Sequence, residues 1–270
     1  MEKHYKQTAL NKLPFLISIP HGGLAIPQEV RNAITISDEE IFEDIDPYTR
    51  EIYNIEDSVE QVVEADIART FVDLNRTPEQ LPPQFPDGII KSATCYNKII
   101  YKPGMAPGKN LIEILINKYH SPYHSVLQNA MKNPLIKMGF DCHSMAAIGP
   151  PVSPDSGKER PLINLGNADG KTCSNKITEL LKNCFKEIFN FAEDKIIINY
   201  PFKGGHITRR YGNNPKPWIQ IEISRALYLS EPWFNKSTLK ADLSRLKELN
   251  NNFKEVMTLF NKKISDEMML

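Results

Sequence analysis

The chain has 270 residues, of which 41% are hydrophobic and 24% charged, the composition of an ordinary globular protein with a substantial core. Lys plus Arg and Asp plus Glu both number 33, which argues against a basic surface for nucleic acid or an anionic membrane. No apolar run reaches the roughly 18 residues of a transmembrane helix, and the polar start lacks the apolar core of a signal peptide. The four cysteines show no Cys-x-x-Cys spacing, which argues against a zinc ribbon or a disulfide scaffold. We therefore expect a soluble, cytoplasmic protein that acts on a small molecule.

Apolar runs alternate with helical patterns along the chain. In chain order, the predicted elements are a strand over 13–19, a short helix after the capping box of Ser37 and Glu40, a helix over 48–61, a strand pair or one broken strand over 62–65 and 70–74, a loop over 77–109, a helix over 110–133, strands over 135–140 and 161–166, a helix over 174–192, a strand over 195–200, a loop over 201–212, a strand over 218–225 and a helix over 237–263. No repeat or linker interrupts this order. We therefore expect one domain over residues 1–270, an α/β fold of three αβα layers around a mixed, mostly parallel sheet.

Two predicted strands deliver a histidine at their ends. The first strand runs into Pro20-His21-Gly22-Gly23, and the apolar run 135–140 runs into Asp141-Cys142-His143-Ser144. Asp141 and His143 share one face of an extended chain, while Cys142 points to the other face and is expected in the core. Histidine can bind a metal ion, and a carboxylate can accept its other N–H or bind the ion directly. Taken singly, each site also fits a hydrogen-bonded structural histidine.

Charged side chains also stand near predicted strand and helix ends. Asp44 and Asp46 precede Pro47, where the short helix must stop, and are candidates to bind a ligand. Arg69 and Arg76 flank the predicted strand 70–74, and a guanidinium can hold a carboxylate. Glu222 faces the same side of its strand as Gln220 and Ser224, as the partner of a salt bridge or as a general base in a cleft.

A second pair of histidines lies within the helix predicted over 110–133. His120 and His124 have the i, i+4 spacing that can bind a metal ion. Pro122 would strain that face, and no glutamate follows the first histidine as in a His-Glu-x-x-His motif. A packing or substrate-lining role is therefore favoured over a metal site.

The predicted strand ends bring His21, His143, Arg76 and Glu222 toward one edge of the sheet. Two histidines and one carboxylate around an open position form a common catalytic zinc set. A glutamate that is not a ligand can then serve as the base for water. Together these residues point to metal-assisted hydrolysis.

The chain also resembles a known family. Its motifs are Ser-Ile-Pro-His-Gly-Gly (18–23), Val-Asp-Leu-Asn-Arg (72–76), Pro-Tyr-His (122–124), Asp-Cys-His-Ser (141–144), Gly-Gly-His-Ile-Thr-Arg (204–209) and Ile-Gln-Ile-Glu-Ile-Ser-Arg (219–225). In this order they resemble the N-formylglutamate amidohydrolase family, a distant relative of zinc carboxypeptidases and aspartoacylase-type deacylases. The resemblance implies their αβα fold and the attack of water on an amide.

The resemblance also implies roles for individual residues. His21 and His143 would bind Zn²⁺ or another divalent metal. Position 24 is Leu24 where carboxypeptidase relatives carry a glutamate ligand, so the third ligand would be Asp46, with Asp44 as the alternative.

Further roles implied by the resemblance concern catalysis and substrate binding. Glu222 would be the general base, and Arg69 would polarise the scissile carbonyl. The substrate-binding set would comprise Asn75 and Arg76 for one carboxylate, Arg209 and Arg225 for a second, and Thr208 and His206 from the glycine-rich loop, where family members often carry an aromatic residue at position 206.

The expected reaction is hydrolysis of an N-acyl amide of an acidic amino acid, typified by N-formyl-L-glutamate giving formate and L-glutamate. The alternatives are another N-acyl-amino-acid deacylase, a carboxypeptidase-like peptidase, or a metal-free binding protein on the same fold.

Overall fold

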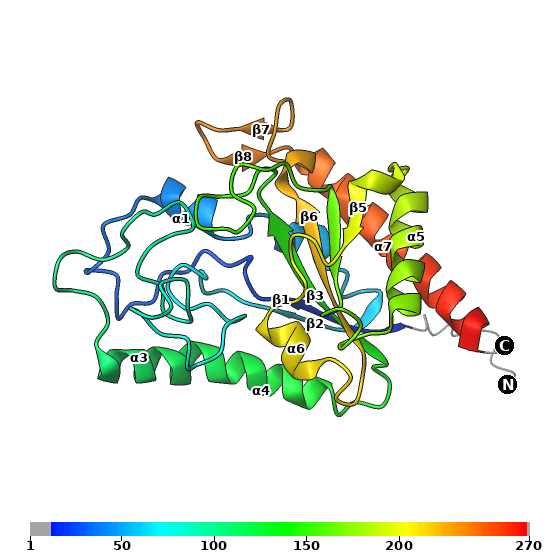
Figure 1. The fold of residues 1–270 in the computed structure, drawn as a ribbon, viewed down its shortest axis with the longest axis horizontal. Helices are drawn as coiled ribbons and strands as arrows, with labels where there is room; N and C mark the ends of the chain where they lie inside the picture. Colours follow the sequence, from blue (N-terminus) through cyan, green and yellow to red (C-terminus); the bar gives the residue numbers. More distant parts are fainter. Residues whose placement is uncertain (1–11, 269–270) are drawn as a thin grey trace, which may run out of the picture.

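The protein is built around a six-stranded mixed sheet. The computed structural model describes residues 12–268 (Figure 1). The strands of the sheet are β1 (Leu13–Ile19), β2 (Val59–Glu64), β3 (Met138–Met145), β4 (Ile163–Gly166), β5 (Ile196–Ile198) and β6 (Trp218–Ser224). Their order across the sheet is β2-β1-β3-β6-β4-β5, and the one antiparallel pairing is β4 against β6. The expected α/β fold with a mixed, mostly parallel sheet is confirmed.

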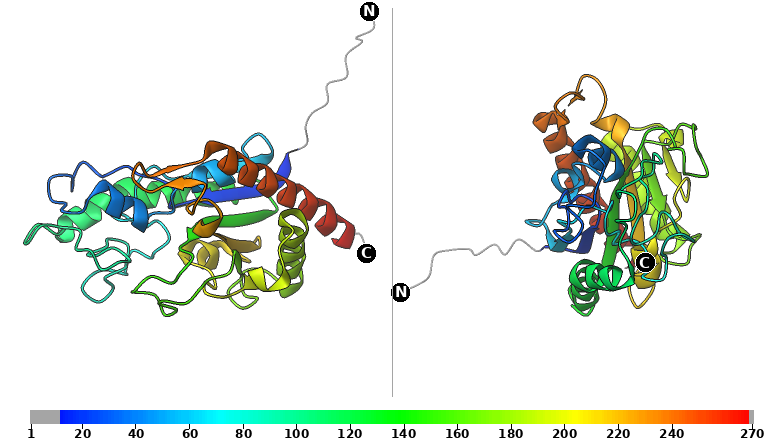
Figure 2. Two further views of the ribbon diagram at one scale, coloured as in Figure 1. Left: turned by 90° about the horizontal axis from the view of Figure 1, so that it is seen from above. Right: turned by 90° about the vertical axis from the view of Figure 1, so that its left-hand side faces the viewer.

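Helices cover both faces of this sheet. The helices are α1 (Asp38–Asp44), α2 (Thr49–Tyr53), α3 (Lys109–Leu115), α4 (Ser121–Ala130), α5 (Asn175–Phe189), α6 (His206–Tyr211) and α7 (Leu243–Met268). The long helix α7 lies along β1 and beside α5, and with α2 they bury one apolar face of the sheet (Figures 1 and 2). On the other face, α4 contacts β2 while α6 contacts β3 and β6. The result is three layers.

Several short elements connect these layers. They are the π-helical turn η1 (Ile116–His120) between α3 and α4, the 3₁₀ turns η2 (Glu193–Lys195) and η3 (Arg225–Leu227), and a hairpin of β7 (Phe234–Asn235) and β8 (Lys240–Ala241). The segment between β2 and α3 contains only isolated bridges and lies beside α1, so the predicted loop over 77–109 is confirmed (Figure 1). In the described part of the chain, no helix is both long and apolar enough to cross a membrane.

The central strand β3 explains why polar residues are buried in this sheet. All eight of its residues are buried, because β1 and β6 pair with its two edges and helices cover both faces. Alternation along β3 places Cys142 in the apolar cluster beneath α7, as expected, and turns Asp141 and His143 to the opposite face. Burial raises the pKa of the Cys142 thiol well above its usual value, which keeps it protonated and inert.

The structure differs from the sequence prediction in four places. The helix predicted over 48–61 ends at Tyr53, because the β-branched residues after it pair with β1 as β2. Residues 70–74 form turns instead of a strand, although their apolar side chains are buried. Residues 206–211, predicted as part of a loop, form the helix α6. The last predicted helix also begins later than expected, because the β7–β8 hairpin occupies residues 234–241.

Candidate active site

A cavity of about 220 Å³ lies at the carboxyl ends of β1, β3 and β6. In an open α/β sheet this edge is the usual place for a ligand. The predicted site residues that line the cavity are His21, Asp46, Arg69, Asn75, Arg76, His143 and Glu222. Four further polar or aromatic residues that were not assigned a role from the sequence join them, namely Ser144, Phe202, Lys203 and Gln220.

Two imidazoles and one carboxylate meet at the centre of this cavity. Asp46 Oδ2 lies 3.0 Å from His143 Nδ1 and 3.4 Å from His21 Nδ1, and the two rings are 4.6 Å apart. His21 follows β1, His143 lies on β3, and the Asp46 amide donates to the His21 carbonyl at 3.0 Å. One atom from each side chain lies within 4.8 Å of the others, and all three residues are buried. The geometric condition for a shared ion is therefore met.

The far nitrogen of each histidine is held by a carboxylate. His21 Nε2 lies 2.8 Å from Asp73 Oδ1, whose second oxygen accepts from Arg69 at 2.8 Å. His143 Nε2 lies 3.1 Å from Asp141 Oδ1. These contacts orient both rings so that their Nδ1 atoms face Asp46. Carboxylates that accept from the other ring nitrogen commonly orient metal-binding histidines in this way. Asp73 had no assigned role in the sequence, although it lies inside the motif 72–76.

The donor set fits a divalent metal ion. His21 Nδ1 is buried and has no hydrogen-bond partner among the described residues, which is costly unless it serves as a ligand. Burial alone would raise the pKa of Asp46, but the hydrogen bond with His143 and the nearby His21 ring hold it well below its usual range. Burial would likewise lower the pKa of His143, but Asp141 and Asp46 raise it well above its usual value. The surroundings of His143 therefore favour positive charge, whether from a proton or from a metal cation.

Glu222 lies beside this set on the neighbouring strand. It is paired in register with His143 across β3 and β6, and its Oε1 accepts from Gln220 Nε2 at 2.6 Å. Burial raises the pKa of Glu222 to about 7, although His143 opposes the shift. A carboxyl group of this pKa can both accept and release a proton near neutral pH.

The chain is similar to known proteins over most of its length. The sequence model of the family described as N-formylglutamate amidohydrolase matches residues 13–229. The chain belongs to this family. It is 28% identical over 229 residues to an N-formylglutamate deformylase of Pseudomonas putida, a match that covers 82% of this chain and 83% of the relative. A deformylase of Pseudomonas aeruginosa is 24% identical over 229 residues, covering 82% of this chain and 84% of that one.

Solved structures show the same fold. An N-formylglutamate amidohydrolase from Ralstonia eutropha has a TM-score of 0.76 at 19% identity, over 95% of this chain and 96% of that one. A gene product of Agrobacterium tumefaciens has a TM-score of 0.67 at 16% identity, over 94% of this chain and 93% of that one. At these identities the similarity speaks for the fold alone.

Asp44 and Asp46 have different surroundings in this N-formylglutamate amidohydrolase family member. Asp44 accepts from Lys91 Nζ at 2.8 and 2.9 Å, from the Cys95 amide at 2.7 Å and from Thr70 Oγ1 at 2.8 Å. Lys91 is only 1% exposed, so this is a buried ion pair. The carboxylate of Asp44 is thus occupied by these partners, and Asp46 alone of the two aspartates contacts the histidines.

Arg225 holds the segment that carries Asp46. Its guanidinium lies 3.2 Å from Asp46 Oδ1, donates to the Glu43 carbonyl at 2.8 Å and to the Ile45 carbonyl, and donates to Ser144 Oγ at 3.1 Å. Arg225 does not line the cavity described above. Its contacts therefore position a candidate ligand.

Asn75 connects β3 to α6. Its Nδ2 lies 3.0 Å from His143 Nε2 and 3.1 Å from Asp141 Oδ2, and its Oδ1 accepts from the Ile207 amide at 2.7 Å. Gly205 permits this approach, since a Cβ there would lie 2.4 Å from Asn75 Nδ2.

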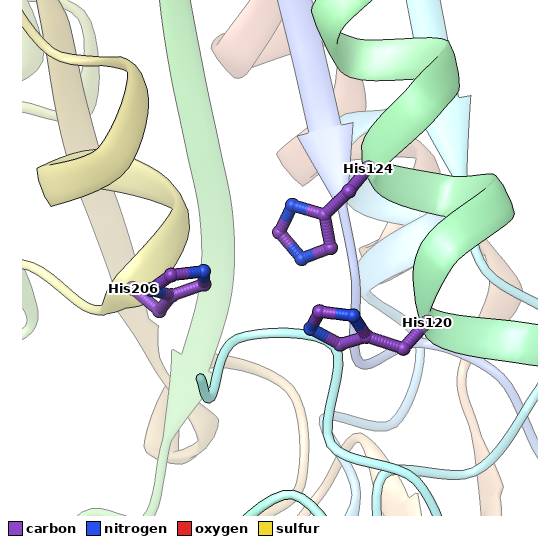
Figure 3. A group of neighbouring side chains, drawn as sticks. All are labelled: His120, His124 and His206. Atoms are coloured by element: carbon purple, nitrogen blue, oxygen red, sulfur yellow. The ribbon is translucent and has the colours of Figure 1, made fainter. Parts of the chain in front are cut away.

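Three other predicted substrate-binding residues, Thr208, Arg209 and His206, are not among the described residues that line this cavity. Thr208 Oγ1 donates to Asp141 Oδ2 at 3.2 Å, and the exposed Arg209 donates to the Gly204 carbonyl at 2.8 Å. His206 does not line the cavity and lies beside His120 and His124 (Figure 3). Arg76 does line the cavity, where it also pairs with Asp87 at 2.7 Å.

Proposed function

We propose that the protein is a metal-dependent amidohydrolase that removes the acyl group from an N-acylated acidic amino acid, most directly N-formyl-L-glutamate. The products are formate and L-glutamate, and water supplies the atoms that complete both. The observation that carries this proposal is the meeting of His21, Asp46 and His143 with Glu222 at one polar cavity in a member of this family. Two relatives named N-formylglutamate deformylase support the choice of substrate.

His21, Asp46 and His143 would hold Zn²⁺ or another divalent cation. Such a cation, when bound, supplies Lewis-acid polarisation of an amide carbonyl and makes water more acidic. Glu222 is the general base that takes a proton from the attacking water and delivers it to the leaving amine. Its pKa of about 7 suits both transfers.

Cationic side chains on the cavity wall would select an acidic substrate. Arg69, Arg76 and Lys203 line the cavity, and arginine suits a carboxylate because its planar fork can donate two hydrogen bonds. Arg69 also reaches the centre of the site through Asp73, which fits a role at the scissile carbonyl. We propose that Asn75 contributes an amide donor at the same wall. Thr208 and Arg225 act by holding Asp141 and Asp46 in place.

The size of the cavity favours an amino-acid derivative over a peptide. About 220 Å³ is below the roughly 300–1,000 Å³ typical of pockets for drug-sized ligands. A small dianion with one formyl group fits this limit better than an extended peptide chain.

The test is an assay of the purified chain with N-formyl-L-glutamate, in which formate release is followed by a coupled dehydrogenase. N-acetyl-L-glutamate, N-formyl-L-glutamine and N-formyl-L-leucine serve as matched substrates that change the acyl group, one charge or the whole side chain. We expect turnover with N-formyl-L-glutamate to be the fastest and to be lost with a chelator or in His143→Ala. Equal rates on N-formyl-L-leucine, or full activity without bound metal, would contradict the proposal.

A further inference from the structure

A second group of histidines lies outside the cavity, next to Arg76, which lines it. His120 ends η1, His124 lies one turn further on α4, and His206 opens α6 on the other side of the gap (Figure 3). One nitrogen from each ring lies within 4.8 Å of the others. The ring centres are 4.2 Å apart for His120 and His124 and 5.3 Å apart for His124 and His206. We propose that these three histidines form a second metal site, for a borderline divalent cation such as Zn²⁺.

The hydrogen bonds of these three histidines determine which ring nitrogens are free to bind a metal ion. His120 Nε2 lies 3.0 Å from the Arg76 carbonyl and His124 Nε2 lies 2.9 Å from the Leu74 carbonyl. A carbonyl only accepts, so both Nε2 atoms carry the hydrogen and both Nδ1 atoms keep a lone pair. This anchoring of one ring nitrogen to a backbone carbonyl is typical of metal-binding histidines.

The third nitrogen has no partner. His206 Nε2 is buried and makes no hydrogen bond to any described residue. The Tyr211 hydroxyl lies 3.0 Å from His124 Nδ1, but it donates to the His124 carbonyl at 3.1 Å. Its single hydrogen serves one of these two acceptors at a time, so a cation at His124 Nδ1 would leave the hydroxyl bonded to the carbonyl. A cation would also satisfy the lone pair of His206 Nε2, which the described residues leave unpaired.

Burial disfavours positive charge on the rings of this cluster. It lowers the pKa of His124 to about 3 and that of His206 to about 4, and it also lowers the pKa of His120. The neutral form that burial favours is the form that binds metal. Three neutral imidazoles suit Zn²⁺, Cu²⁺ or Ni²⁺, whereas Mg²⁺ and Ca²⁺ prefer oxygen ligands.

Charges of both signs surround the cluster. Arg210 opposes a cation at all three rings, but its side chain is exposed and is screened by solvent. Glu79 favours positive charge at His120 and His206. Tetrahedral binding at the usual Zn–N distance needs nitrogens about 3.3 Å apart, so the rings must close slightly. His206 has room for this, since it is only partly buried at the first residue of a short helix.

A cation here would join α6 to α4. His120 and His124 hold the carbonyls on either side of Asn75, and the His206 amide donates to the Asn75 carbonyl at 3.3 Å. The second site would therefore stiffen the support of Asn75, which contacts His143 directly. The proposal concerns metal binding alone and does not depend on the function proposed above.

The test is a Zn²⁺ titration of the full chain. The purified protein is stripped with a chelator and titrated against a chromophoric zinc indicator, and bound metal is counted by mass spectrometry. We expect two equivalents for the natural chain and one for His206→Phe, which keeps a ring but removes both nitrogens. His143→Ala should also bind one equivalent, and the double variant none. Far-UV circular dichroism checks folding, and His206→Gln replaces His206→Phe if the phenylalanine is not accommodated.

The outcomes separate the two sites. One equivalent in the natural chain that is kept in a folded His206→Phe, or two equivalents in a folded His206 variant, would refute the second site. Loss of one equivalent in a folded His206→Phe would support it. If instead His143→Ala alone binds as much Zn²⁺ as the natural chain, the ligand set of the proposed active site is wrong while the second site stands.

Discussion

Asp44 and Asp46 are two residues apart, yet the structure predicts opposite effects when each is replaced by asparagine. Asp44→Asn removes the charge that pairs with the buried Lys91 and leaves it only Asp87, at 3.1 Å and 42% exposed. Breaking one partner of a buried ion pair costs about 3–5 kcal/mol. For a chain of this size each kcal/mol lowers Tm by about 2 °C, so we expect a fall of about 6–10 °C. The metal at the proposed active site should remain.

Asp46→Asn, unlike Asp44→Asn, should weaken metal binding at the proposed active site. Asp46 is the one carboxylate that contacts both His21 and His143, and loss of even an outer partner of a ligand lowers metal affinity by about 10–100-fold. We expect a larger loss of affinity at this site, measured by competition with a chelator. Asp44→Asn is the matched control in that assay, and scanning calorimetry of both variants completes the comparison. If Asp44→Asn lost the metal and kept its Tm, the assignment of the two aspartates would be wrong.

The remaining predictions concern the base, the outer carboxylate and a surface loop. Glu222→Gln should keep the bound metal and lower kcat by about two to four orders of magnitude. The exposed control Glu231→Gln should leave kcat unchanged. Equal kcat values in the two variants would remove Glu222 from the mechanism. Asp73→Asn weakens the anchoring of His21 and should lower metal affinity by about 10–100-fold in a chelator competition, so an unchanged affinity would show that this contact is dispensable. The hydrogen bond from Arg160 lowers the pKa of Asp155 to about 2, so its stabilising effect is present above the unfolded pKa of about 4 and is lost as pH falls toward 2. Measured by urea unfolding, the free energy of unfolding of Asp155→Asn should fall less steeply than that of the natural chain as the pH is lowered over this range. An identical pH dependence would argue against the pairing of Asp155 with Arg160.

The main frame of the fold could be predicted because its signals are local. The run at 13–19 is apolar throughout and becomes β1 with the predicted bounds, and the capping box of Ser37 and Glu40 is present at the start of α1. Strand alternation at 141–143 correctly separated the core side of Cys142 from the polar side of His143. These features depend on neighbouring residues alone.

Other features depend on partners that are distant in the sequence. The helix predicted over 48–61 overlaps β2, because pairing with β1 makes residues 59–64 a strand. The difference between Asp44 and Asp46 depends on Lys91, which reaches Asp44 from a loop without regular structure. Asp73 was missed because residues 70–74 read as a strand, whereas they form the turn that directs this carboxylate at His21. The sequence alone does not show which distant residues come into contact.

The position of β3 in the sheet bears on how the protein is made. Its two edges pair with β1, which is synthesised more than a hundred residues earlier, and with β6, which comes more than seventy residues later. On a ribosome, β1 and β2 can associate early, but one edge of β3 stays open until residue 224 has emerged. Long-range pairing of this kind slows folding and exposes strand edges. The nascent chain is therefore prone to aggregate until β6 pairs with β3. Chaperones that hold unfolded chains should matter most in that interval.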